Sequence, residues 1–96
     1  MERYHLKLFI TGKTPRSLRA IDNLERICHN QLGEACRLEV IDVLEAPERA
    51  EEARILATPT VIRELPRPLR RIIGDLSDTR MVLQGLELQP MDGPPD

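Results

Sequence analysis

Apolar and polar residues alternate near the start of the chain as they do in a half-buried strand. Across residues 4–11, Leu6, Leu8 and Ile10 fall on one face, and the apolar Phe9 falls on the other. This alternation predicts a strand whose two faces are both partly covered.

A helix is predicted from Pro15 to about Leu32. Thr14 is a residue type that caps helices, and Pro15 suits the first helical position because its missing N–H would have no partner there. Gly33 is expected to end the helix. Its expected buried stripe, read at helical spacing, is Leu18, Ile21, Leu24, Ile27 or Cys28, and Leu32.

The pattern then predicts a second strand over residues 36–44, with apolar side chains on both faces. Pro47 opens a second helix with acidic residues early and Arg54 late, which matches the helix dipole. Its expected buried stripe is made mostly of small residues, which anchor a helix weakly: Ala50, Ala53, and Leu56 or Ala57.

The C-terminal half carries shorter elements. Thr58-Pro59 interrupts the chain, and short strands follow over residues 60–63 and 70–74, joined by a turn at 65–68. Ser77 is expected to cap a last helix over residues 77–88. After Pro90, the tail at 91–96 is expected to be disordered.

The resulting order, β-α-β-α-β-β-α, is that of an α/β thioredoxin-like fold in one domain, residues 1–90. The first β-α-β unit implies a parallel strand pair, and the last two strands imply an antiparallel hairpin. Thioredoxin-like folds commonly carry a cis proline before the third strand, so Pro59 is expected to be cis.

The composition of the chain limits the classes of partner that it is expected to bind. The net charge is −2, and Trp is absent with one Tyr and one Phe, so neither a basic surface nor an aromatic platform for nucleic acid is expected. No apolar run is long enough to span a membrane, and a cytoplasmic protein is expected.

The cysteines argue against thioredoxin-type redox chemistry. That chemistry needs a thiolate at the start of the first helix, where this chain has Gly12-Lys13-Thr14-Pro15. Cys28 and Cys36 form no CxxC or zinc pattern and are expected to be buried small residues or free thiols. No catalytic residue, metal ligand or cofactor is predicted, although glutathione transfer, which need not use a cysteine, stays open.

The sequence closely resembles the KaiB family of bacterial clock proteins from about Tyr4 to Leu88. The most specific stretches are Ile55-Leu56-Ala57-Thr58-Pro59-Thr60 and Arg70-Arg71-Ile72-Ile73-Gly74-Asp75-Leu76-Ser77. Further stretches that carry the resemblance are Leu6-Lys7-Leu8-Phe9, Thr14-Pro15-Arg16-Ser17-Leu18-Arg19-Ala20, Val40-Ile41-Asp42-Val43-Leu44 and Val82-Leu83-Gln84-Gly85-Leu86-Glu87-Leu88.

The resemblance implies a non-enzymatic regulator. KaiB proteins bind the hexameric ATPase KaiC, promote its dephosphorylated phase, sequester KaiA in cyanobacteria, and compete with a sensor kinase whose input domain is KaiB-like. It also implies a metamorphic protein, with a dimeric or tetrameric resting fold rearranged in the C-terminal half and a thioredoxin-like monomer that binds KaiC.

The chain departs from the cyanobacterial pattern in two places, and the second departure weakens the expectation of a KaiA partner. Arg67 interrupts a proline-rich turn between Pro66 and Pro68, and only Asp92 and Asp96 represent the long acidic tail. A KaiB–KaiC pair without KaiA, serving an hourglass timer or a stress response, fits these differences.

Two sets of site residues follow. KaiC is expected to dock on the face that carries the second helix and the Thr58-Pro59 turn: Pro47, Glu48, Arg49, Glu52, Thr58 and Pro59. The expected switch residues are Pro66, Pro68 and Gly85, the last because a glycine inside a helix disfavours the thioredoxin-like form. The alternatives are a glutathione-dependent transferase and a detached KaiB-like sensor domain.

Overall fold

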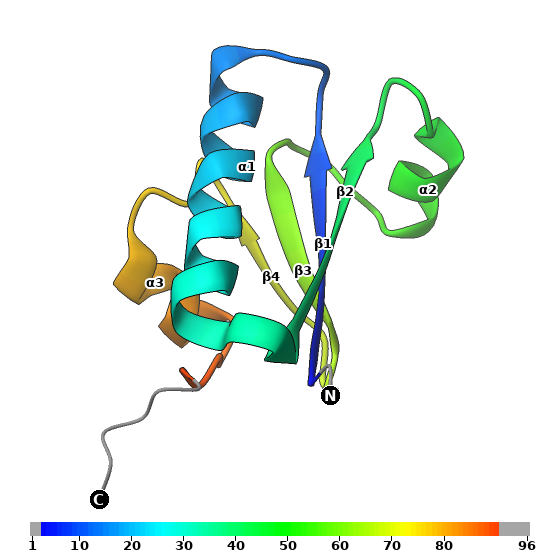
Figure 1. Cartoon of the computed structure of the whole chain (residues 1–96). Helices are drawn as coiled ribbons and strands as arrows, with labels where there is room; N and C mark the ends of the chain where they lie inside the picture. Colours follow the sequence, from blue (N-terminus) through cyan, green and yellow to red (C-terminus); the bar gives the residue numbers. More distant parts are fainter. Residues whose placement is uncertain (1–2, 91–96) are drawn as a thin grey trace, which may run out of the picture.

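The computed structural model describes residues 3–90, in which a four-stranded sheet carries helices on both faces (Figure 1). The elements, in chain order, are β1 (Tyr4–Ile10), α1 (Pro15–Ile27), β2 (Cys36–Asp42), α2 (Pro47–Glu52), β3 (Thr60–Leu65), β4 (Arg70–Ile73) and α3 (Thr79–Gly85). A π-helical turn (Cys28–Leu32) and a 3₁₀ turn (Gly33–Ala35) join α1 to β2. The tail expected at 91–96 lies outside the described residues.

The sheet has the strand order β2-β1-β3-β4. β1 runs parallel to β2 and antiparallel to β3, and β3 forms an antiparallel hairpin with β4. The predicted order and both predicted pairings are therefore confirmed. β2 ends earlier than expected because the Asp42 carboxylate accepts hydrogen bonds from the backbone N–H groups of Gly12 and Leu44 and turns the chain.

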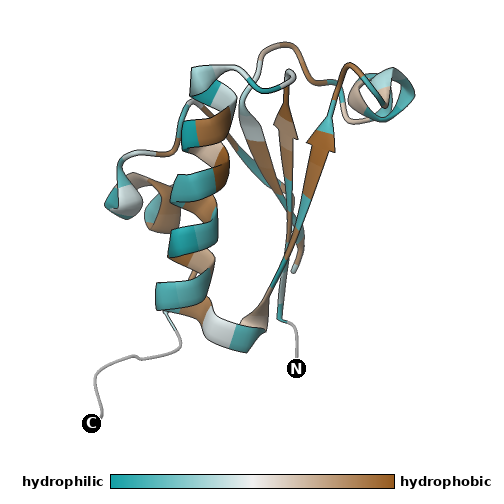
Figure 2. Ribbon diagram, turned by 45° about the horizontal axis from the view of Figure 1, so that its top comes forward, coloured by the Kyte–Doolittle hydropathy of each residue, from teal (hydrophilic) through white to brown (hydrophobic). Residues whose placement is uncertain are grey.

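The alternation in β1 sorts its side chains between two cores. Leu6, Leu8 and Ile10 belong to the larger core, which is completed by apolar residues of α1 and α3. Phe9 packs on the opposite face with Ile41 and Ile62, under the segment that contains α2. In Figure 1, α1 and α3 lie on one side of the sheet and α2 lies on the other, and Figure 2 shows hydrophilic residues on much of the outer surface of α1.

The start of α1 is capped as predicted, since Thr14 Oγ1 accepts a hydrogen bond from Ser17 N at 3.1 Å. The predicted stripe is wrong at Leu18, whose side chain is half exposed, while Ser17 is buried in its place. The Ser17 hydroxyl accepts from Thr11 N and donates to Thr11 O, so hydrogen bonding to the preceding loop sets the rotation of the first turn.

α2 departs from its predicted packing. It has only six residues and none of them is buried, and Leu56, an expected stripe residue, is almost fully exposed. The helix stops because Arg54 adopts a positive φ of 55°. Ile55 then packs against the Phe9 cluster, so the chain after the helix supplies the apolar anchor.

α3 is shorter than the predicted helix over 77–88. Its cap is Asp78, whose Oδ1 accepts a hydrogen bond from Met81 N at 3.1 Å, and not Ser77. Ser77 N instead donates to Asp75 Oδ1, a bond that helps to lower the pKa of Asp75. The Asp75 carbonyl accepts a hydrogen bond from Asn23 of α1, which fixes the approach to α3.

A buried arginine joins the C-terminal elements to the sheet. The Arg63 side chain is almost fully buried, and its guanidinium donates hydrogen bonds to Leu86 O and Pro68 O, both at 2.7 Å. Its Nε has no hydrogen-bond partner among residues 3–90. One side chain of β3 therefore holds both the end of α3 and the turn of the β3–β4 hairpin.

We expect Arg63→Met to lower the free energy of unfolding by about 2–4 kcal/mol, because buried polar groups left without a partner cost about 1–3 kcal/mol each. Urea unfolding followed by circular dichroism measures this change. Arg80→Met, on the exposed side of α3, is the matched control and should change little. Equal stability of both variants would show that the Arg63 bonds do not hold the C-terminal elements.

Candidate functional site

The α2 face presents the charged residues that the sequence placed in a docking surface. Pro47, Glu48 and Glu52 are exposed, and Arg49 is partly exposed. Glu48 and Glu52 form no salt bridge with any residue in the range 3–90. Their carboxylates are therefore available to a partner.

Arg49 is oriented by a neighbouring strand. Its guanidinium makes two hydrogen bonds to the Glu39 carboxylate of β2, at 2.6 and 3.1 Å. These bonds lower the pKa of Glu39 and raise the pKa of Arg49. A bidentate pair restricts the side chain, so Arg49 is presented in a defined direction.

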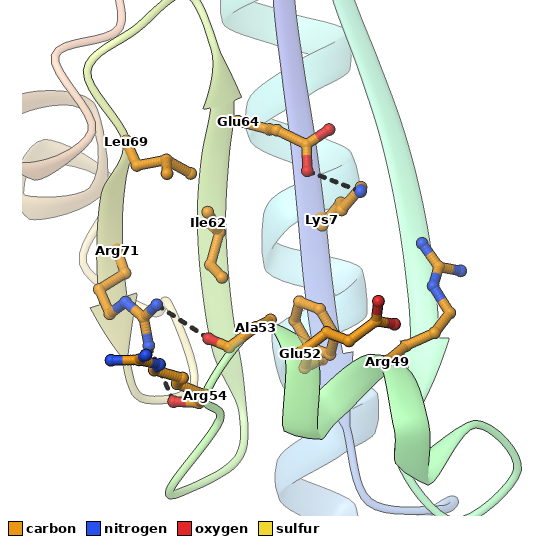
Figure 3. A pocket seen from close by; sticks show the side chains of 10 residues that line it. Lys7, Arg49, Glu52, Ala53, Arg54, Ile62, Glu64, Leu69 and Arg71 are labelled. Atoms are coloured by element: carbon orange, nitrogen blue, oxygen red, sulfur yellow. Dashed lines mark hydrogen bonds and ion pairs between the residues drawn. The ribbon is translucent and has the colours of Figure 1, made fainter.

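A hollow of about 380 Å³ lies beside α2 on the outer face of the sheet (Figure 3). Its apolar lining includes Phe9 and Ile62, both almost fully buried, and the half-exposed Leu69. Charged residues from four elements complete the lining of this α2 hollow: Lys7, Arg49, Glu52, Arg54, Glu64 and Arg71. An apolar floor with both signs of charge at the rim suits a protein side chain with polar neighbours.

Two contacts shape the α2 hollow across the sheet. Lys7 and Glu64 form an ion pair at 2.6 Å. Arg71 donates to the carbonyl oxygens of Arg54 and Ala53, at 3.1 and 3.0 Å, and so ties β4 to the end of α2. Sequence reasoning missed the strand residues of this hollow. The outward parity of Phe9 in β1 was one signal for them, but the strands that form the hollow are distant from α2 in sequence.

The Thr58-Pro59 bond is cis, as predicted. Pro59 itself is fully buried, and its carbonyl accepts a hydrogen bond from Gly74 N at 2.9 Å. Pro59 therefore presents no exposed side chain in this fold, and its contact with a partner stays a prediction. Thr58 Oγ1 lies 2.5 Å from Thr11 Oγ1 and joins this turn to the end of β1.

Four of the predicted docking residues lie in α2 and two follow it, and the six do not meet in one pocket. Arg49 and Glu52 line the α2 hollow, whereas Thr58 lines a second hollow of about 210 Å³ with the strongly exposed Leu56. Ala50 of α2 lines this second hollow too. A partner that covers α2 can contact both.

The α1 start holds no thiol. The residues there are Gly12-Lys13-Thr14-Pro15, whereas Cys28 follows the far end of α1 and Cys36 pairs with Tyr4 at the start of β1. Within residues 3–90, no group of three or more His, Cys, Asp or Glu side chains could hold a metal ion. No helix of the described chain is long and apolar enough to cross a membrane.

The predicted switch residues Pro66 and Pro68 lie between β3 and β4, and Gly85 lies at the end of α3. The peptide bonds before Pro66 and Pro68 are both cis, and Pro68 O accepts the hydrogen bond from Arg63. Gly85 belongs to a helix as expected, but it is the last residue of α3 and does not lie in the helix interior. A Cβ atom added at Gly85 would lie 2.6 Å from Ile72 Cδ1, which shows that α3 approaches β4 closely there.

The family model and the known relatives that match this chain belong to the same family. Residues 7–88 match the KaiB domain family. The chain is 54% identical over 90 residues to "Circadian clock protein KaiB3" of Synechocystis sp., covering 94% of this chain and 88% of that protein. It is 52% identical over 85 residues to "Circadian clock oscillator protein KaiB" of Nostoc punctiforme, covering 88% and 82% of the two chains.

Solved structures with the same architecture confirm the thioredoxin-like fold. The N-terminal domain of SasA from Synechococcus elongatus superposes with a TM-score of 0.72 at 25% identity, covering 97% of this chain and 90% of that domain. Mitochondrial thioredoxin 3 from Saccharomyces cerevisiae also gives a TM-score of 0.72, at 19% identity, covering 91% and 79%. The second likeness concerns the fold alone.

The close approach of α3 to β4 yields a test at Gly85. Gly85→Ala should lower the free energy of unfolding of this fold by about 1–2 kcal/mol, because the new methyl group overlaps Ile72 Cδ1. Ile72→Val removes that Cδ1, so the same alanine should cost less in the valine background. Urea unfolding of the wild type, both single variants and the double variant gives the coupling energy. Strict additivity would mean that the two residues do not crowd each other.

Proposed function

The chain belongs to the KaiB family, and we propose that it is a non-enzymatic timing regulator that docks on a KaiC-type hexameric ATPase and promotes its dephosphorylated phase. The relatives that support a clock role are 52% and 54% identical and are named circadian clock proteins. The KaiB match covers most of the described chain. The absence of a thiol at the start of α1 agrees with binding rather than thioredoxin-type chemistry.

The α2 face is the proposed docking surface. The observation that supports it is a hollow whose apolar lining combines the buried Phe9 and Ile62 with the exposed Leu69, and whose rim carries the charges of Arg49 and Glu52. Interfaces commonly combine a buried apolar centre with a polar border. Leu56 extends the apolar surface to the far side of α2, because its side chain is 96% exposed.

The proposal includes fold switching in the C-terminal half, with a dimeric or tetrameric resting state and a monomer bound to KaiC. The second half has short strands and a helix of seven residues, so few local signals favour one packing over another. Pro66, Pro68 and Gly85 are the proposed switch residues. Because Gly85→Ala crowds Ile72, it should destabilise the thioredoxin-like form and favour the resting fold. A glycine in a helix interior implied the opposite, namely that alanine would favour the thioredoxin-like form.

Further partners fall within the same proposal. A KaiC pair that works without KaiA, in an hourglass timer or a stress response, is part of the proposal, and KaiA stays a candidate partner. A sensor histidine kinase with a KaiB-like input domain is a candidate competitor, which the likeness to the SasA N-terminal domain fits. The same likeness keeps a detached sensor domain as an alternative function.

Glutathione-dependent transfer is the alternative from the enzyme class. Its candidate site is the hollow of about 210 Å³ that is lined by Thr58. Glutathione-agarose binding together with a conjugation assay tests it: clear binding and turnover would displace the regulator proposal. Native mass spectrometry with a KaiC hexamer from the same source tests the leading proposal directly, and no complex in any nucleotide state would contradict it.

Charge reversal on α2 locates the docking surface. Glu52→Arg and Arg49→Glu should each weaken binding to KaiC by about tenfold, since an opposed charge at an interface costs on the order of 1.4 kcal/mol or more. Biolayer interferometry with immobilised KaiC measures the change. Unchanged affinity in both variants would remove this face from consideration.

Two controls separate docking from folding. Glu34→Arg, in the 3₁₀ turn before β2, is an exposed reversal of the same type and should bind normally. The exchange Glu39→Arg with Arg49→Glu restores the internal ion pair but not the charge shown to a partner. If the exchanged variant binds as the wild type does, Arg49 acts through Glu39 and not through KaiC.

A further inference from the structure

Two cysteines that are eight positions apart meet at the end of the sheet away from α2. Cys28 begins the π-helical turn that follows α1, and Cys36 is the first residue of β2. Their sulfur atoms lie 2.7 Å apart. Cys28 is 8% exposed and Cys36 is partly exposed, so solution reaches the pair from the Cys36 side.

The chain segments that carry the two cysteines are each fixed by packing or by hydrogen bonds, which keeps the two sulfur atoms together. Ile27, which precedes the π-helical turn, and Leu32, which is its last residue, are buried in the larger core. The start of β2 is fixed by the pairing of Cys36 with Tyr4 and by the hydrogen bond from Arg3 N to Ala35 O, at 2.7 Å. The chain reverses between them at Gly33, whose φ of 55° suits glycine. The proximity therefore belongs to the fold and does not depend on a mobile loop.

We propose that Cys28 and Cys36 are a redox modification site, in which a low-molecular-weight disulfide such as oxidised glutathione converts the two thiols into an intramolecular disulfide. The site is independent of the proposed docking on KaiC. It also differs from the thioredoxin redox centre, which lies at the start of the first helix. Cytosolic disulfides are mostly transient and redox-sensing, which fits a reversible bond.

The exchange balances in two steps. Cys36 loses its proton, and its sulfur attacks one sulfur of oxidised glutathione, forming a mixed disulfide and releasing one glutathione thiolate. Cys28 then loses its proton, and its sulfur attacks the Cys36 sulfur and releases the second glutathione thiolate. The two protons lost by the cysteines end on the two glutathione thiols, so the protein loses two hydrogens and one glutathione disulfide is reduced.

The surroundings of the thiols set this order of attack. The hydrogen bond with Cys36 and burial both raise the pKa of the Cys28 thiol, so Cys28 stays protonated in the reduced protein. Cys36 is the more exposed sulfur and meets the oxidant first. Once Cys36 is in the mixed disulfide, the hydrogen bond that most raises the pKa of Cys28 is lost, and the second attack becomes easier.

The disulfide would join the end of the α1 segment to β2 across a short closed loop. A cross-link of this kind restricts the unfolded chain more than the folded one. The oxidised protein should therefore unfold at a higher urea concentration than the reduced protein. Thr60, at the opposite end of the sheet, pairs with Phe9, whereas Cys36 pairs with Tyr4, so oxidation should leave the α2 face unchanged.

The test incubates the full chain with oxidised glutathione and follows thiol content and intact mass. The wild type should lose both thiols and two hydrogen atoms while staying free of intermolecular cross-links, and its urea midpoint should rise. Cys28→Ser should stop at a mixed disulfide carrying one glutathione on Cys36. Cys36→Ser should react more slowly than Cys28→Ser, because the remaining sulfur is buried. Dithiothreitol should reverse each product.

Three results would overturn the proposal: two thiols that persist in the folded wild type but oxidise in urea, a wild-type mixed disulfide that never resolves, or cross-linked dimers as the main product. Equal reaction rates of the two single variants would overturn the assigned order of attack. KaiC binding by the reduced Cys28→Ser/Cys36→Ser variant should match the wild type. A failure of KaiC binding in every form would count against the proposed function and leave the thiol result intact.

Discussion

The hydrogen bonds of Arg63 hold the second half of the fold in place. Burying a guanidinium is costly unless it is hydrogen-bonded, and here two of its partners are the carbonyls of Leu86 and Pro68. These bonds fix the end of α3 and the β3–β4 turn relative to β3. The same hairpin positions Arg71, whose bonds to the chain after α2 shape the hollow on the opposite face. One buried side chain therefore influences both faces of the sheet.

The two faces of the sheet are covered to different extents. The face under α1 and α3 carries the larger core, whereas α2 buries none of its own residues and leaves the α2 hollow open. Thin cover of an apolar face is unfavourable for a lone monomer and useful for a protein that docks on another. The KaiB family membership gives the α2 face its proposed partner.

The thioredoxin-like fold does not bring thioredoxin chemistry with it, because function depends on the residues placed at a site. At the start of α1, Thr14 caps the helix and Ser17 binds the preceding loop, which leaves those groups in structural roles. The thiols lie together at the other end, where they border the core. The proposed docking surface and the proposed redox modification site are thus separated along the length of the sheet.

The sequence by itself determined the element order, which side chains of β1 face each side of the sheet, and the helix cap at Thr14. Each of these depends on residues that are close in the chain. The family resemblance was equally visible in contiguous stretches. Tertiary structure decided which residue turned inward at the start of α1, where α2 stopped, and that a methyl group at Gly85 would meet Ile72. It also brought together Cys28 with Cys36, and Phe9 with Ile62 beneath α2. These outcomes depend on the rotation of helices and the register of strands, which are set by contacts between residues far apart in the chain.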